Sequence, residues 1–304
     1  MQAPAMLSTL TEINLDDLFA ALGWENLRNS RLLRRLFRPA ALRFAHQVVA
    51  YDSAVATMGL QAGSRRFLTT LQKELLISGQ HYIPASGSVL FLSNHPGMTD
   101  TVSLFASIPR PDLRIVAAER PFLHALPATD RQLIYVSADN TTRTSTIRAV
   151  SSHLRAGGAV LTFPAGEIEP DPAVLPGAEA SMQSWGPSIG LFARLAPQSV
   201  LIPVIVSGVL SPRATDHPLT RLRRLSKDRE RLGATLQIFS GVVAPALWPE
   251  LWQVTVRVRF APPIPAAGLL SLHDPAAITQ AVVDCIRPFL REIIRSDNPA
   301  LLTD

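Results

Sequence analysis

Short apolar runs alternate with segments of helical periodicity between residues 88 and 206, and this order restricts the possible folds more than any other feature of the chain. The apolar runs indicate strands near 88–93, 113–118, 133–136, 159–163 and 200–206. Helical patterns lie near 99–107, 144–156 and 186–196. Such alternation is typical of a largely parallel sheet with helices packed against it.

The two ends of the chain differ from this alternating centre. Residues 12–74 are mostly helical in pattern, whereas residues 254–260 alternate apolar and polar side chains, as in an edge or antiparallel strand with one wet face. We predict an α/β fold: a largely parallel mixed sheet flanked by helices over residues 75–304, after an N-terminal helical segment, residues 1–74. Pro203 lies inside an apolar run and predicts an edge or bulge position, because proline cannot donate to a strand ladder.

Composition excludes several classes of protein. Hydrophobic residues make up 47% of the chain, but no apolar run reaches the roughly 18 residues that a membrane-spanning helix needs. The start of the chain lacks the basic and apolar regions of a signal peptide. Cys285 is the single cysteine, which excludes an internal disulfide and a multi-cysteine zinc site. The histidines are scattered without a metal-binding pair, so we expect no metal.

A basic segment over residues 27–44 suggests contact with an anionic membrane surface. One face of the predicted helix is apolar, with Leu33, Leu36, Phe37, Ala40 and Phe44. The other face is basic, with Arg28, Arg31, Arg35 and Arg38. This pattern is typical of a helix in a membrane interface, although a core helix with a solvated basic face has the same pattern. We expect a peripheral protein on the cytoplasmic side of a membrane. Nucleic acid is not an expected partner, because aromatic residues are only 6% and no base-binding motif is present.

The segment Asn94-His95-Pro96-Gly97-Met98-Thr99-Asp100 has the residues of a general base and its orienting carboxylate. It follows a predicted buried strand, and Pro96-Gly97 turns the chain toward a helix that Thr99 would cap. His95 could then take a proton from a hydroxyl near neutral pH, while Asp100 holds the other ring nitrogen. Gly97, which lacks a side chain, would let a substrate approach the backbone.

Two later segments strengthen this interpretation. Residues 159–167 form another predicted buried strand that ends in a turn, Phe163-Pro164-Ala165-Gly166-Glu167, and residues 200–206 form a third strand that carries a proline. Ligands bind at the carboxyl ends of strands in open α/β sheets, so Gly166 and Glu167 are candidate site residues. Glu167 could orient an acceptor or form a hydrogen bond near His95.

The order and spacing of these segments, over about residues 75–210, resemble the glycerolipid acyltransferase family, which includes the lysophosphatidate and glycerol-phosphate acyltransferases. The family's signature is Asn-His-four residues-Asp, then Phe-Pro-Glu-Gly-Thr-Arg, then an apolar strand with proline. The resemblance implies catalysis by His95 and Asp100. It also implies substrate-binding positions, which are Asn94, Gly97, Arg143, Phe163, Pro164, Gly166 and Glu167. The implied reaction moves a fatty acyl group from acyl-coenzyme A or acyl carrier protein to a lipid hydroxyl, without a cofactor.

The chain departs from the family's pattern at the residues that hold the acceptor's phosphate. Ala138 and Ile168 stand where the resemblance leads one to expect arginines. Arginine suits phosphate because its planar fork donates two hydrogen bonds. Arg143 could compensate from a nearby position. The alternatives are therefore an acyltransferase for a non-phosphate lipid or a secondary-metabolite alcohol, or a non-catalytic lipid-binding protein of the same fold.

Overall fold

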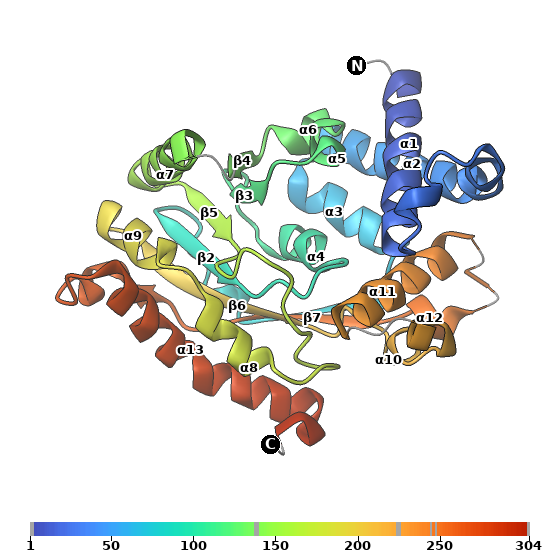
Figure 1. The fold of residues 1–304 in the computed structure, drawn as a ribbon. Helices are drawn as coiled ribbons and strands as arrows, with labels where there is room; N and C mark the ends of the chain where they lie inside the picture. The colour runs from blue at the N-terminus through green and yellow to red at the C-terminus, as the bar shows by residue number, and fades with distance from the viewer. Residues whose placement is uncertain (1–2, 137–139, 223–225, 244, 247, 303–304) are drawn as a thin grey trace. The chain divides into compact units, whose positions relative to one another are not determined.

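The computed structural model of the chain describes residues 3–136, 140–222, 226–243, 245–246 and 248–302. The chain folds into two compact units (Figure 1). The first comprises residues 1–74, 120–131 and 210–255, and the second comprises residues 75–119, 132–209 and 256–304.

The first unit is helical. Its helices are α1 (Ala3–Ala21), α2 (Arg31–Met58), α3 (Leu60–Leu68), α5 (Pro121–His124), α6 (Pro127–Asp130), α10 (Pro212–Thr215), α11 (Ser226–Val243) and α12 (Pro249–Trp252). The predicted division into residues 1–74 and 75–304 differs from the structural units, because two later segments join the helical unit. Ala125 and Leu126, for example, are buried in one apolar cluster with residues of α1 and α2.

The second unit contains the predicted sheet, whose strand order is β1-β7-β6-β2-β5-β3-β4, with β8 also paired to β6. The strands are β1 (Glu74–Ser78), β2 (Val89–Ser93), β3 (Arg114–Ala118), β4 (Leu133–Val136), β5 (Ala159–Thr162), β6 (Val200–Ser207), β7 (Thr255–Phe260) and β8 (Ile264–Pro265). Strands β2 to β6 pair in parallel, whereas β7 and β8 are antiparallel to β6. The predicted α/β class is therefore confirmed.

Helices cover the sheet and fix its central strands. They are α4 (Asp100–Ser107), α7 (Asn140–Arg155), α8 (Ala178–Ser181), α9 (Ser188–Leu195) and α13 (Pro275–Asp297). A large apolar cluster packs side chains of β2, β5 and β6 against α7, α9 and α13. Every residue of β2 is buried, as expected for a parallel strand that is covered on both faces.

Pro203 does not mark a sheet edge, so the edge alternative of this prediction was wrong. Strand β6 is central: it pairs with β2 on one side and with β8 and then β7 on the other. Pro203 lies between these last two pairings, because Leu201 pairs with β8 and Val204 pairs with β7. The carbonyl of Pro203 accepts a hydrogen bond from Ala261, which follows β7. The N–H that proline lacks therefore falls at the junction between the two partner strands.

In the basic segment of α2, the predicted apolar face is divided: part of it packs on α1, and part of it is exposed. Phe37 contacts the ring of Phe19 of α1 at 6.0 Å between centroids, so part of the predicted apolar face is internal. Arg34 forms ion pairs with Glu12 and Asp16 of α1. Leu36, which was expected on the apolar face with Phe37, is instead 66% exposed. No helix among the described residues is both long enough and apolar enough to cross a bilayer.

Candidate active site

The chain reverses direction between β2 and α4 in a turn that needs glycine. Gly97 has φ of 83°, and the next residue, Met98, also has positive φ, at 57°. The second value is unusual for a residue with a side chain, and such conformations are frequent at functional sites. Thr99 occupies the predicted N-cap position but makes no capping hydrogen bond through its side chain. The turn places Asp100 at the start of α4, directly after the loop that carries His95.

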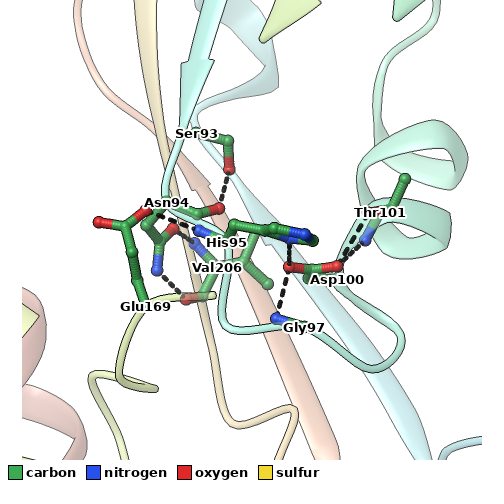
Figure 2. A network of polar contacts seen from close by, with 8 residues as sticks. All are labelled: Ser93, Asn94, His95, Gly97, Asp100, Thr101, Glu169 and Val206. Carbon is green, nitrogen blue, oxygen red and sulfur yellow. Dashed lines mark hydrogen bonds and ion pairs between the residues drawn. The ribbon is translucent and has the colours of Figure 1, made fainter. Parts of the chain in front are cut away.

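His95 and Asp100 meet across this turn, as the spacing predicts. Nδ1 of His95 lies 2.7 Å from Oδ2 of Asp100 (Figure 2). The Asp100 side chain is only 1% exposed, whereas the His95 side chain remains 27% exposed. Because a carboxylate accepts hydrogen bonds, Nδ1 carries the ring proton and Nε2 keeps its lone pair. The pair therefore has the geometry of a general base with its orienting carboxylate.

Asp100 is itself held by further donors. Its Oδ2 also accepts a hydrogen bond from the backbone N–H of Gly97 at 2.8 Å. Its Oδ1 accepts from the hydroxyl of Thr101 at 2.9 Å and from the Thr101 backbone N–H. Thr101 was not among the predicted site residues, although its place directly after the aspartate was a usable signal. These bonds fix the carboxylate in the orientation that His95 requires.

The amide of Asn94 joins the catalytic turn to the sheet. Its Nδ2 donates to the carbonyl of Val206 at 2.9 Å, and its Oδ1 accepts from the N–H of Val206 at 2.8 Å. Asn94 is 5% exposed. The side chain thus extends the pairing of β2 with β6 by one residue. This is a structural role, and the predicted contact of Asn94 with substrate stays a prediction.

The loop after β5 lies beside this turn, because β5 pairs in parallel with β2. The ring of Phe163 stacks on the imidazole of His95, with centroids 4.4 Å apart and planes inclined by 34°. Pro164 is buried, and its carbonyl accepts a hydrogen bond from Gly186. Gly166 has φ of 69° and closes the turn by donating to the carbonyl of Phe163. The structure therefore brings Phe163 into contact with His95.

Ile168 and Glu167 are exposed on the same loop. Ile168 is 56% exposed, and its Cδ1 would lie 3.1 Å from a Cβ atom added to Gly97. An apolar side chain therefore borders the catalytic turn where the resemblance leads one to expect an arginine. A second carboxylate near His95, which the sequence reasoning missed, is Glu169: it accepts a hydrogen bond from the His95 backbone N–H.

Burial and two neighbouring carboxylates shift the pKa of His95 in opposite directions. Burial lowers the pKa of His95, but the negative charges of Asp100 and Glu169 and the hydrogen bond that His95 donates to Asp100 raise it, and the net pKa lies above the ordinary value. A base with a raised pKa is a stronger proton acceptor when it is neutral. The site is therefore suited to deprotonating a weakly acidic group such as a hydroxyl.

Two predicted features lie outside the described part of the structure. They are Ala138 and the side chain of Arg143, although the Arg143 backbone belongs to α7. Among the described residues, no group of three or more His, Cys, Asp or Glu side chains could hold a metal ion.

The match to a known family agrees with this geometry. Residues 74–207 match the family model described as Acyltransferase, and this range includes both β2 with its catalytic turn and β5 with its loop. Residues 74–207 therefore form an acyltransferase domain. The predicted family resemblance is confirmed at this level. The reaction thus requires an acyl donor and an acceptor.

Two further comparisons add little. No curated protein matches the chain. Among solved structures, the chain is similar to the 1-acyl-sn-glycerophosphate (LPA) acyltransferase PlsC from Thermotoga maritima, with 14% sequence identity, 100% of each chain covered and a TM-score of 0.43. At this level of similarity no conclusion about the present chain is based on it.

Proposed function

We propose that the protein is an O-acyltransferase that moves a fatty acyl group from acyl-coenzyme A or acyl carrier protein to the hydroxyl of a lipid. The observation that supports this most directly is the 2.7 Å contact between His95 Nδ1 and Asp100 Oδ2 within an acyltransferase domain. Neutral His95 takes the hydroxyl proton on Nε2 as the oxygen attacks the thioester carbon. The C–S bond then breaks, an ester forms, and the thiolate receives the proton from His95. Asp100 supports the imidazolium throughout.

Replacement of the base tests this function. His95→Ala should lower kcat by roughly 10²–10⁴-fold, which is the usual contribution of a positioned general base. The measurement is the release of free thiol from acyl-coenzyme A in the presence of a lipid alcohol. His153→Ala is a matched control, because Nε2 of His153 donates to the carbonyl of Asp112 and His153 belongs to α7, outside the turn between β2 and α4. If His95→Ala keeps near wild-type turnover while folded, this mechanism is wrong.

The acceptor that we propose is a hydroxyl lipid without a terminal phosphate. The supporting observation is Ile168, which is exposed beside Gly97. A phosphate that is removed from water without a matched cation is costly to bind, and isoleucine offers it no donor. A neutral or zwitterionic lipid would instead lay an apolar part against Ile168. The competing acceptor is lysophosphatidate, and the ratio of specificity constants for the two substrates decides between them.

We also propose that the helical unit binds peripherally to the cytoplasmic face of an anionic membrane. Leu32 and Leu36 are 77% and 66% exposed, one turn apart on α2. Arg31 and Arg35 are exposed next to them on the same helix. Apolar side chains among arginines are suited to the boundary between headgroups and acyl chains.

Substitution of these two leucines by serine tests membrane binding. The double variant Leu32→Ser, Leu36→Ser should lose most of its flotation with vesicles that contain anionic lipid. Binding by the wild type should also weaken at high salt, since salt screens the arginines. Leu219→Ser is the control, because Leu219 is an exposed leucine, at 47%, of the same unit outside α2. Equal flotation of the double variant and the control would contradict the proposal.

A further inference from the structure

Glu169 holds both backbone groups of the catalytic histidine. Its Oε2 accepts a hydrogen bond from the His95 N–H at 3.0 Å (Figure 2). Its own N–H donates to the His95 carbonyl at 2.8 Å. The two residues are far apart in the chain and belong to the loops after β5 and β2. Glu169 thus ties these two loops together at His95.

The other carboxylate oxygen is bound to a rigid part of the core. Oε1 accepts hydrogen bonds from the Trp185 indole N–H at 2.9 Å and from the Ser181 hydroxyl at 3.0 Å. Trp185 is 5% exposed and belongs to the apolar cluster that packs on the sheet. Glu169 itself is 4% exposed. A buried carboxylate with donors on both oxygens has a fixed orientation. Because Trp185 and Ser181 hold Glu169 in place, Glu169 in turn holds His95 in place.

Glu169 also contributes charge. The carboxylates whose charge acts on His95 are Asp100 on α4 and Glu169 on the β5 loop, and both raise its pKa against the effect of burial. Burial raises the pKa of Glu169, while hydrogen bonds from Trp185, Ser181 and His95 lower it, and the net shift is upward. The same side chain can therefore influence the position and the basicity of His95.

We propose that Glu169 is a positioning residue for His95, which fixes the histidine backbone from the side opposite to Asp100. This role rests on the function proposed above. Figure 2 shows Glu169 at the His95 backbone and Asp100 at its ring, so the two carboxylates hold different parts of one residue. Glu167, which the sequence analysis considered as a hydrogen-bond partner near His95, is exposed.

The test compares Glu169→Gln with Asp171→Asn. Asp171 is a matched control because it is a fully buried carboxylate of the same loop that accepts from the backbone N–H groups of Gly208 and Val209, and the charges that raise the His95 pKa are those of Asp100 and Glu169. Glutamine keeps the volume but loses the charge, and its NH₂ group would face a donor. We expect Glu169→Gln to lower kcat by roughly 10- to 100-fold with little change in KM, because small misplacements of a catalytic group have effects of this size.

The pKa of His95 gives a readout that a merely structural role would not change. In NMR titrations, Glu169→Gln should lower the His95 pKa, and the acid limb of the kcat/KM profile should move to lower pH. Glu169→Asp keeps the charge, so it should retain more of the wild-type pKa while kcat still falls. Asp171→Asn should leave the His95 pKa unchanged. If Glu169→Gln is unfolded by circular dichroism, Glu169→Asp decides the question by its kcat.

The outcomes separate this inference from the proposed function. A folded Glu169→Gln variant with the kcat and His95 pKa of wild type would overturn the positioning role, while an inactive His95→Ala variant would leave the general-base mechanism intact. A fully active His95→Ala variant would overturn the mechanism itself. A fall in kcat for Glu169→Gln that Asp171→Asn matches, without a change in the His95 pKa, would also reject the inference.

Discussion

The turn after β2 and the loop after β5 lie at neighbouring strand ends, but different kinds of contact shape them. In the turn, the functional pair is five residues apart, and His95 meets Asp100 through a local reversal of the chain. In the loop, Glu169 acts on a residue 74 positions away. One active site can therefore combine a pair specified by local spacing, His95 and Asp100, with a residue placed only by tertiary packing, Glu169.

The largest expected effect concerns the locally specified part. Asp100→Asn should lower kcat by roughly 10²–10⁴-fold, because an amide cannot support the imidazolium and would turn a donor toward His95 or Gly97. The variant is compared with wild type by thiol release, with folding checked by circular dichroism. Activity within threefold of wild type would show that the contact between Asp100 and His95 is not needed for the reaction. The β2 turn would then no longer differ from the β5 loop in its contribution to catalysis.

The pH dependence reports on both segments together. The pKa of His95 is raised, so the base is protonated and inactive at low pH. The kcat/KM of the wild type should therefore rise with pH to a midpoint above about 6.5 and fall about tenfold per pH unit below it. His95→Gln provides the comparison, since its residual activity should lack this limb. A wild-type rate that is flat from pH 5 to 8, with chemistry rate-limiting, would argue against a histidine base.

Substitution at Ile168 probes the exposed side of the β5 loop. Ile168→Arg restores a cation beside Gly97 and should raise the specificity constant for lysophosphatidate, relative to a neutral hydroxyl lipid, by about tenfold, since a hydrogen bond to a charged group contributes about 1.5–3 kcal/mol. Leu272→Arg is the control, because Leu272 is another exposed apolar residue of the same unit. An equal rise for both variants would indicate general charge attraction. Strong preference of the wild type for lysophosphatidate would refute the proposed acceptor.

The smallest effect is expected on stability, at the join between the turn and the sheet. Asn94→Ala removes both hydrogen bonds to Val206 and leaves buried backbone groups without partners, so it should lower the free energy of unfolding by about 1–3 kcal/mol. Urea denaturation measures the change. Ser184→Ala is a control, since Ser184 bonds within its own short helical turn and is exposed. A loss below about 0.5 kcal/mol would show that the strand pairing alone places the turn.

Local patterns in the sequence explain why much of the fold and half of the site could be predicted. Apolar runs such as 88–93 and 159–163 became β2 and β5, because continuous hydrophobicity is what a doubly covered parallel strand requires. His95 and Asp100 were found because their contact needs only a short turn. Glu169 was missed because its role depends on the pairing of β2 with β5 and on Trp185, and no local spacing encodes these contacts.

The structure also differs from the sequence-based expectations at Pro203 and Leu36, because both positions depend on contacts between distant elements. Pro203 indicated an edge, but its position in the middle of the sheet depends on where β7 gives way to β8. Periodicity placed Leu36 and Phe37 on one apolar face of the helix, whereas in the structure Phe37 contacts Phe19 of α1 and Leu36 is exposed. Periodicity defines which residues share a face, but the partner element decides which face becomes internal.

The shared acceptor Oδ2 of Asp100 has a consequence for proton exchange. One oxygen binds both the ring proton of His95 and the amide proton of Gly97, and the carboxylate is almost inaccessible to water. Both protons should therefore exchange with deuterated solvent only when the turn opens. The opposite nitrogen, Nε2, has no such protection. A reagent that modifies free imidazole nitrogens should consequently label His95 at a single atom, the one that the acceptor hydroxyl would approach.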